Sequence, residues 1–372
     1  MKAVRNLFRI LLGVVFIFSG FVKGVDPLGT VYRMEDYFIA FGIQWAIPFA
    51  LVLTIFLVVL EFTLGISLMF NFWIKKTSWL LLPMMTFFTV LTFFDAVYNM
   101  VPDCGCFGDA LKLTNLQTFL KNIVLMAMVI PVFVWRNKYR SPLGCRWNII
   151  VLSAFAALCT CLSVYCYYHL PLIDFMAWKV GNKVKTVESL PVKFYVTYKN
   201  RKTGELKEYL APNYPWSDST WLSEWVFKSQ RVEDPNLNQT MALRVEDQNG
   251  NDMTSVILDN PGFQFIVVAY DLTKSSPDGF LKLLPFYKQS LTDGLGFICL
   301  TTTLPSDIKT FRLKQGTAFG FYNADDVVLK TMVRANPGVI LIRNGVVVAK
   351  WSWRDLPPYG QVKEKFMQPM SK

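Results

Sequence analysis

The chain has 372 residues, of which 53% are hydrophobic, and a formal net charge of +11. This length is enough for two or three domains. No basic stripe interleaved with aromatic residues is present, so we expect no nucleic-acid partner. A lipid bilayer is the expected partner instead, because nearly all the long apolar runs lie before residue 170.

Five apolar segments are long enough to cross a bilayer, which takes about 20 residues of helix. The first follows a basic start, as in a signal peptide, but no small-residue cleavage site follows it, so we expect a retained helix. The predicted spans are residues 7–22, 45–72, 78–100, 116–135 and 147–168.

The loops on the two sides of the membrane differ in charge. One side holds four basic and five acidic residues, with Lys23 among the basic ones, whereas the other side holds nine basic residues and no acidic one. The nine are Lys2, Arg5, Arg9, Lys75, Lys76, Arg136, Lys138, Arg140 and Arg146. Because loops rich in Lys and Arg stay in the cytoplasm, we expect a bacterial inner-membrane protein with a cytoplasmic N-terminus. Residues after 168 would then be periplasmic.

Two acidic residues, Glu61 and Asp95, fall inside the predicted spans. A charge at the centre of a bilayer costs roughly 3 kcal/mol on insertion scales, so such residues need a reason to be there. Glu61 is either an intramembrane acid that handles protons or faces a quinone, or a structural group that bonds a neighbouring helix, for instance at Ser19. For Asp95, near the outer end of its span, the structural role is favoured.

Cys104 and Cys106 flank a glycine in the outer loop after the third span. A disulfide across this spacing would be strained, and strained disulfides exchange readily. The pair is therefore a candidate catalytic dithiol, or else an inert pair that shapes the loop. A metal site is not expected, because no second cysteine pair or nearby histidine completes a ligand set.

Parts of this region resemble known membrane proteins. Residues 16–23 resemble the opening of the DoxX family, and residues 60–65 resemble its second helix. The Cys-Gly-Cys-Phe-Gly run at 104–108 resembles the motif of the MauE branch of that group. The resemblance covers about residues 1–140. It implies a four-helix membrane bundle and an association with redox or disulfide maturation, without naming a substrate.

The remainder of the chain reads as a mixed α/β region. Alternating residues at 193–198 and 205–210, around a polar turn, predict a β-hairpin. From residue 263 onward, buried strands and amphipathic helices alternate and end in a hairpin around Arg343-Asn344-Gly345. The predicted strands are 263–270, 296–301, 320–323, 339–342 and 346–349, and the predicted helices are 278–291 and 305–314, with another starting near 324.

This order of elements resembles the thioredoxin fold over about residues 261–356. Asn336, Pro337 and Gly338 resemble its cis-proline turn, beside which that fold holds extended chains. Residues 271–277, where a redox-active member has its Cys-x-x-Cys pair, contain no cysteine, and Cys299 lies in a predicted core strand. The resemblance therefore implies partner binding at Asn336, Pro337 and Gly338 without dithiol chemistry in this domain.

The predicted architecture has four parts. They are a DoxX/MauE-like four-helix membrane bundle (1–140), a fifth membrane helix (141–170), a β-rich periplasmic segment (171–250) and a thioredoxin-like periplasmic domain (251–372). The two-part layout is similar to that of proteins of Bacteroidetes.

Two functions remain open. The first is an inner-membrane accessory or scaffold protein of the cell envelope, whose redox-inactive domain binds a periplasmic or membrane protein. The alternative is a membrane thiol/disulfide redox component that uses Cys104 and Cys106, for which a quinone would be a suitable cofactor. The sequence does not decide whether the protein is an enzyme, and a transporter is disfavoured because no repeat is evident.

Overall fold

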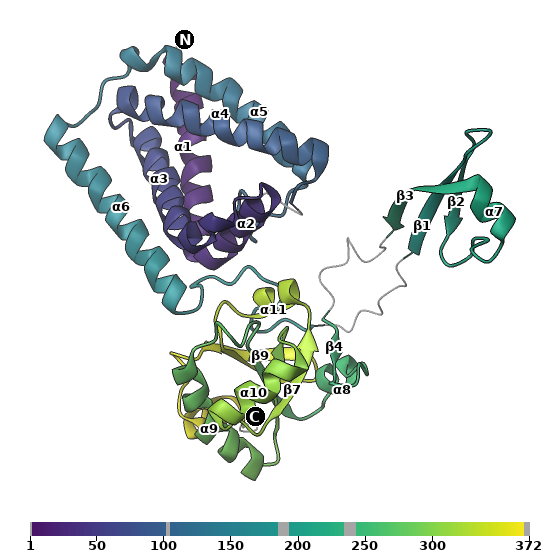
Figure 1. Ribbon diagram of the computed structural model, residues 1–372. Helices are drawn as coiled ribbons and strands as arrows, with labels where there is room; N and C mark the ends of the chain where they lie inside the picture. The colour runs from purple at the N-terminus through teal and green to yellow at the C-terminus, as the bar shows by residue number, and fades with distance from the viewer. Residues whose placement is uncertain (1, 102–104, 185–192, 234–242, 368–372) are drawn as a thin grey trace. The chain divides into compact units, whose positions relative to one another are not determined.

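The structure is a computed structural model that describes residues 2–101, 105–184, 193–233 and 243–367 (Figure 1). The chain divides into two compact units. The first comprises Met1–Lys179 together with the short segments Val333–Val339 and Lys350–Pro358. The second comprises Val180–Met332, Ile340–Ala349 and Tyr359–Lys372.

Five helices of the first unit are long and apolar enough to cross a membrane, which confirms the five predicted spans in number and approximate position. They are α1 (Lys2–Val25), α3 (Ala50–Phe70), α4 (Ile74–Tyr98), α5 (Asn115–Val134) and α6 (Cys145–Tyr168). The ends differ by a few residues from prediction. The difference matters at Lys23, which was expected in an outer loop but lies in the last turn of α1 and is buried.

A short helix, α2 (Pro27–Ala40), occupies the segment that was predicted to be a loop, and a 3-10 helix, η1 (Gln44–Phe49), forms the start of the predicted second span. Asp26 caps α2 by accepting a hydrogen bond from the Gly29 amide at 3.0 Å, and Pro27 takes the first helical position. This start signal was visible in the sequence. Span prediction misses α2 because the helix has only 14 residues and is too short to cross a bilayer.

The core of the bundle is built from α1, α3, α4 and α5. Side chains of all four helices form one buried apolar cluster, which includes Leu12, Leu68, Leu81 and Val129. Helices α4 and α5 run side by side (Figure 1), with the ring of Trp79 5.0 Å from that of Phe133.

Glycines let α1 and α3 approach closely. A Cβ atom added at Gly65 of α3 would lie 2.6 Å from the backbone nitrogen of Ile17, and one added at Gly20 of α1 would lie 2.8 Å from that of Phe62. Small residues at such contacts are typical of membrane helices, where close packing replaces the hydrophobic effect. The two backbones are therefore in direct contact.

We predict that Gly65→Ala lowers the thermal stability of the purified protein. The added methyl group would push α1 away from α3, and overpacking of this kind costs about 1–3 kcal/mol, more than alanine gains in helix propensity. Gly144→Ala is the matched control, because nothing lies within 4 Å of its added Cβ atom. A Gly65→Ala protein that melts at or above the parent temperature would contradict the close contact.

A three-stranded antiparallel sheet has the order β2-β1-β3. Its strands are β1 (Lys193–Asn200), β2 (Leu206–Leu210) and β3 (Trp225–Glu233), joined between β2 and β3 by α7 (Ser219–Glu224). The predicted hairpin is confirmed by the pairing of β1 with β2. The ring of Trp221 in α7 lies 4.6 Å from Tyr198 and 6.1 Å from Trp225, so the aromatic residues here form a local core.

A second sheet has six strands in the order β4-β7-β6-β5-β8-β9. Strands β5, β6 and β7 are parallel. The strands are β4 (Val245–Glu246), β5 (Phe263–Val268), β6 (Gly296–Thr301), β7 (Gly320–Ala324), β8 (Gly338–Arg343) and β9 (Val346–Ser352). The accompanying helices are α8 (Thr254–Leu258), α9 (Pro277–Thr292), α10 (Pro305–Gln315), α11 (Asp326–Met332) and α12 (Tyr359–Phe366).

The element order predicted from residue 263 onward is confirmed, whereas β4 and α12 were not predicted. Two local expectations also hold. The Asn336–Pro337 peptide bond is cis, and Cys299 is fully buried in β6, where burial raises the pKa of its thiol.

Candidate functional site

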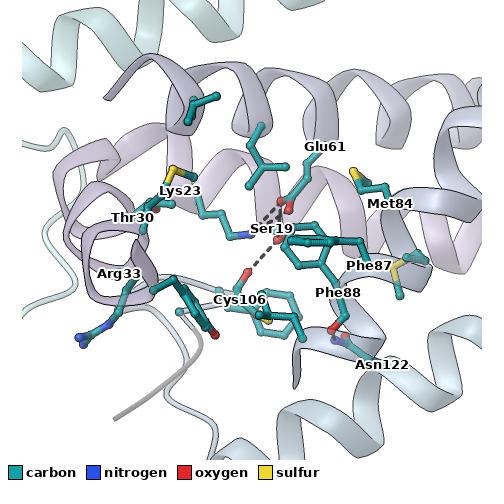
Figure 2. A pocket seen from close by; sticks show the side chains of 18 of the residues that line it. Ser19, Lys23, Thr30, Arg33, Glu61, Met84, Phe87, Phe88, Cys106 and Asn122 are labelled. Atoms are coloured by element: carbon teal, nitrogen blue, oxygen red, sulfur yellow. Dashed lines mark hydrogen bonds and ion pairs between the residues drawn. The ribbon is translucent and has the colours of Figure 1, made fainter. Parts of the chain in front are cut away.

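A cavity of about 480 Å³ lies inside the helical bundle (Figure 2). Side chains from α1 to α5 line it, together with the segment 105–107 that follows α4. Most of these side chains are apolar. The volume falls within the range of about 300–1,000 Å³ in which proteins bind small molecules.

Polar side chains from α1, α2, α3 and α5 also line the cavity, and those of α1 and α3 bond one another. Lys23 Nζ lies 2.9 Å and 3.0 Å from the two carboxylate oxygens of Glu61. Ser19 Oγ lies 3.0 Å from Glu61 Oε2 and 2.8 Å from the carbonyl oxygen of Cys106, so its one proton can be donated to either acceptor. Residues 19 and 23 are one helical turn apart, which places both side chains on the same face of α1.

The ion pair between Lys23 and Glu61 is buried, with only 7% and 6% of the two side chains exposed. Removing either charge from water costs several kcal/mol, and the partner charge offsets that cost only where both are present. The pair therefore fixes α1 to α3 beside the cavity.

The structure brings two predicted site residues to this place. Glu61 makes the predicted bond to Ser19 and, in addition, the ion pair with Lys23 that the sequence reasoning missed. Cys106 lines the cavity beside them, and its backbone reaches Glu61 through Ser19. Cys104, the other half of the predicted dithiol, lies outside the described residues.

Asp95 does not line the cavity. Its side chain is fully buried, and the hydroxyl of Tyr37 in α2 donates a hydrogen bond to Asp95 Oδ2 at 2.5 Å. This contact fits the structural role that the sequence favoured. It also joins α2 to α4.

The predicted partner-binding residues lie apart from the cavity, because none of the three is among the residues that line it. Pro337 and Gly338 are buried and Asn336 is half-buried. A Cβ atom added at Gly338 would lie 2.4 Å from the Val333 side chain, so this position has room only for glycine.

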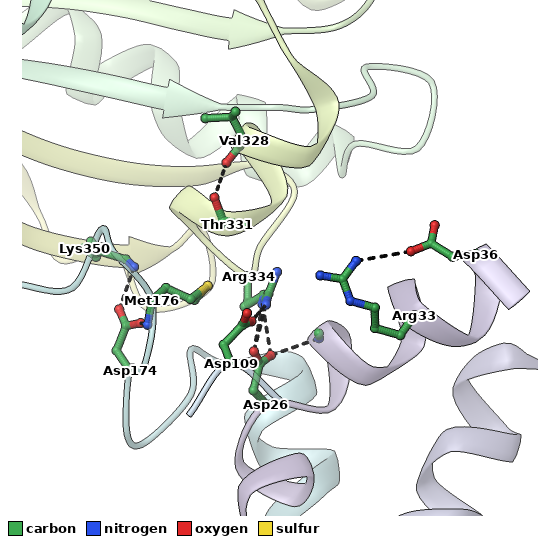
Figure 3. Close-up of polar contacts among 11 residues, drawn as sticks. Asp26, Arg33, Asp36, Asp109, Asp174, Met176, Val328, Thr331, Arg334 and Lys350 are labelled. Atoms are coloured by element: carbon green, nitrogen blue, oxygen red, sulfur yellow. Dashed lines mark hydrogen bonds and ion pairs between the residues drawn. The ribbon is translucent and has the colours of Figure 1, made fainter. Parts of the chain in front are cut away.

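Arg334, next to that segment, is the centre of a second buried cluster in the first unit (Figure 3). Its Nε lies 3.0 Å from both carboxylate oxygens of Asp26, and its Nη2 lies 2.6 Å from Asp109 Oδ2. Burial alone would lower the pKa of the Arg334 guanidinium, but the two carboxylates outweigh that effect and raise it above its ordinary value. Sequence reasoning missed this cluster, because no local motif marks Arg334.

The cluster connects two elements that shape the site. Asp26 caps α2, which lines the cavity, and Asp109 follows shortly after Cys106 in the chain. Arg334 therefore holds the start of α2 and the segment after Cys106 in fixed positions.

Removing one member of the Lys23–Glu61 pair should destabilise the bundle. We expect Lys23→Met to lower the free energy of unfolding by about 3–5 kcal/mol, because Glu61 would remain charged and buried without its partner. The double variant Lys23→Met/Glu61→Gln should recover a large part of that loss. Thermal unfolding in detergent measures both, and equal destabilisation of the single and double variants would contradict the pairing.

We also predict that Arg334→Lys lowers the melting temperature of the full-length protein. Lysine keeps the charge but cannot reach both carboxylates with a rigid fork of donors, and each lost hydrogen bond to a charged group costs about 1.5–3 kcal/mol. Arg343→Lys is the control, since Arg343 is exposed, donates a hydrogen bond to the neutral carbonyl oxygen of Pro261 and lies over the Phe263 ring. Equal melting of the two variants would argue against the cluster.

The long apolar helices and the buried polar site between them define an integral membrane protein with a helical bundle. Within that class, residues 1–135 match the model of the family described as methylamine utilisation protein MauE. The match covers α1 to α5, and with them Ser19, Lys23, Glu61 and Cys106. The membrane part of the chain is therefore MauE-like. No curated protein matches the chain.

Proposed function

We propose that this MauE-like protein is an inner-membrane accessory component of thiol–disulfide exchange in the cell envelope, with Cys104 and Cys106 as the exchanging pair. The observation that carries the proposal is the position of Cys106 on the wall of the cavity. The Ser19 hydroxyl lies within hydrogen-bond distance of both the Cys106 carbonyl oxygen and the Glu61 carboxylate of the buried ion pair. The cysteine is thus held against a polar site inside the membrane part.

The exchange reaction conserves electrons and protons when the partner is a protein with two thiols. One thiolate of the partner attacks a sulfur of the Cys104–Cys106 disulfide and forms a mixed disulfide, and the other sulfur leaves as a thiolate. The second partner thiol then attacks the mixed disulfide, so the partner loses two electrons and two protons and the pair gains them. The strain expected in a disulfide across one glycine favours this direction. The role of Cys104 rests on the sequence.

A scaffold function is the second candidate, and it is favoured by the chemistry of the six-stranded sheet. Residues 271–277, between β5 and α9, contain no cysteine, and Cys299 is buried in β6 with a raised thiol pKa. The parallel strands β5 to β7 and the final hairpin support a thioredoxin-like fold for residues 251–372. Such a periplasmic domain, without its own dithiol, would hold an envelope protein beside Asn336, Pro337 and Gly338.

The two candidates differ in what the cysteines do in cells. If the pair works as a unit, Cys104→Ser and Cys106→Ser should give the same loss of function, and trapping with a mass-shifting alkylating reagent should find the parent pair in a mixed redox state. Neither single serine variant should oxidise a reduced dithiol partner, because one cysteine alone offers no disulfide for the partner thiolate to attack.

Cys145→Ser is the control for these variants, since Cys145 is exposed and does not line the cavity. If each single variant at 104 and 106 behaved like the parent, and the pair stayed in one state under oxidant and reductant, the exchange function would be lost. The scaffold function would then stand, with Asn336 and its neighbours as the next positions to vary.

A further inference from the structure

We infer that the cavity in the bundle binds a lipid-soluble quinone. Its size, its opening, its polar groups and its aromatic wall each support this ligand class. Only the redox role of the quinone, the oxidation of Cys104 and Cys106, rests on the proposed function. The binding itself uses residues other than the cysteine pair.

The cavity reaches the surface that lipid covers. Four of its lining side chains are among the exposed apolar residues of the first unit: Phe41, Leu53, Phe56 and Phe87, with exposed fractions of 46%, 42%, 65% and 62%. On a helix that crosses a membrane, an exposed apolar side chain faces acyl chains. A ligand can therefore enter from the bilayer, and a ligand that enters there is lipid-soluble.

The polar groups of the cavity suit a head group with hydrogen-bond acceptors. Lys23 and Glu61 carry opposite charges 2.9 Å apart, so their fields largely cancel, and two further cations, Arg33 and Lys121, also line the cavity. The N–H groups of these cations are the donors that a carbonyl oxygen would meet. Thr30 of α2 lines the cavity too, and its buried hydroxyl has no hydrogen-bond partner among the described residues, so a ligand oxygen would be a suitable partner for it.

Aromatic side chains also line the cavity. The Phe88 ring lies with its centroid 6.0 Å from Lys23 Nζ, and both residues line the cavity (Figure 2). Phe38 and Phe107 line it as well. A flat ring packed on Phe88 gains the contact energy of aromatic pairs and brings a carbonyl oxygen towards Lys23. A quinone has both the ring and the carbonyl groups, and its apolar tail would lie towards Phe56 and Phe87.

The position of Cys106 on the same wall relates this ligand to the proposed exchange. When the Cys104–Cys106 dithiol forms its disulfide, two S–H bonds break, one S–S bond forms, and two electrons and two protons are released. A quinone accepts all of them at its two carbonyl oxygens and becomes the hydroquinone. This step would regenerate the disulfide after each partner protein has been oxidised.

The test is a titration of the purified full-length protein in detergent with decylubiquinone, followed by thermal shift and calorimetry. Met84→Trp is the principal variant, because Met84 lines the cavity and the larger side chain would fill it without removing a charge. It should weaken binding by about tenfold or more. Leu80→Trp, on the same helix but lipid-facing and outside the cavity lining, should bind as the parent does.

Two further arms separate the inference from the proposed function. The Cys104→Ser/Cys106→Ser variant should bind decylubiquinone with parent affinity, although its thiols cannot reduce it. If it does, and the reduced parent also fails to convert the quinone to hydroquinone, the binding site stands and the regeneration of the disulfide by quinone is overturned. If the parent binds no better than Met84→Trp, or if oleate binds and decylubiquinone does not, the quinone site is overturned whatever the cysteines do.

Discussion

The ion pair between Lys23 and Glu61 is the constraint on which the rest of the membrane site depends. A lone carboxylate in the second span would be too costly to keep charged, and a lone ammonium at the end of the first span would be equally isolated. Together they join α1 to α3, and Ser19 beside them lies within hydrogen-bond distance of both Glu61 and the Cys106 carbonyl oxygen. The polar lining of the cavity, the position of the Cys106 segment and the contact between α1 and α3 therefore all depend on the Lys23–Glu61 ion pair.

The features that follow from local chemistry could be predicted from the sequence. A bilayer demands about 20 apolar residues for each helix, so the five spans are visible as runs, and period-2 and period-3.6 patterns revealed the strands and helices after residue 263. Glu61 stood out because its neighbours are all apolar or small. Its partner did not, because α1 continues one turn beyond the apolar run that ends at Val22 and so includes Lys23.

Contacts between distant segments could not be predicted in this way. Arg334 and Asp26 are 308 residues apart in the chain, and neither has a sequence context that indicates the other. Asp26 and Pro27 are a typical start signal for a helix. Helix α2 was nevertheless not predicted, because the segment between two predicted spans was treated as a loop. The cavity was missed for the same reason, since α2 forms part of its wall. The function of Glu61 depends on these non-local features.

The glycine contact between α1 and α3 has a mechanical consequence. At Gly65 and Gly20 the backbones of α1 and α3 touch, and no side chain lies between them that could rotate to allow one helix to shift against the other. The two helices therefore move as one rigid unit. Ser19, Lys23 and Glu61 all belong to these two helices and so keep their positions relative to one another. Any change in the width of the cavity must then come from the other helices that line it, α2, α4 and α5. The side of the cavity formed by α1 and α3 is therefore rigid, and only its other sides can move.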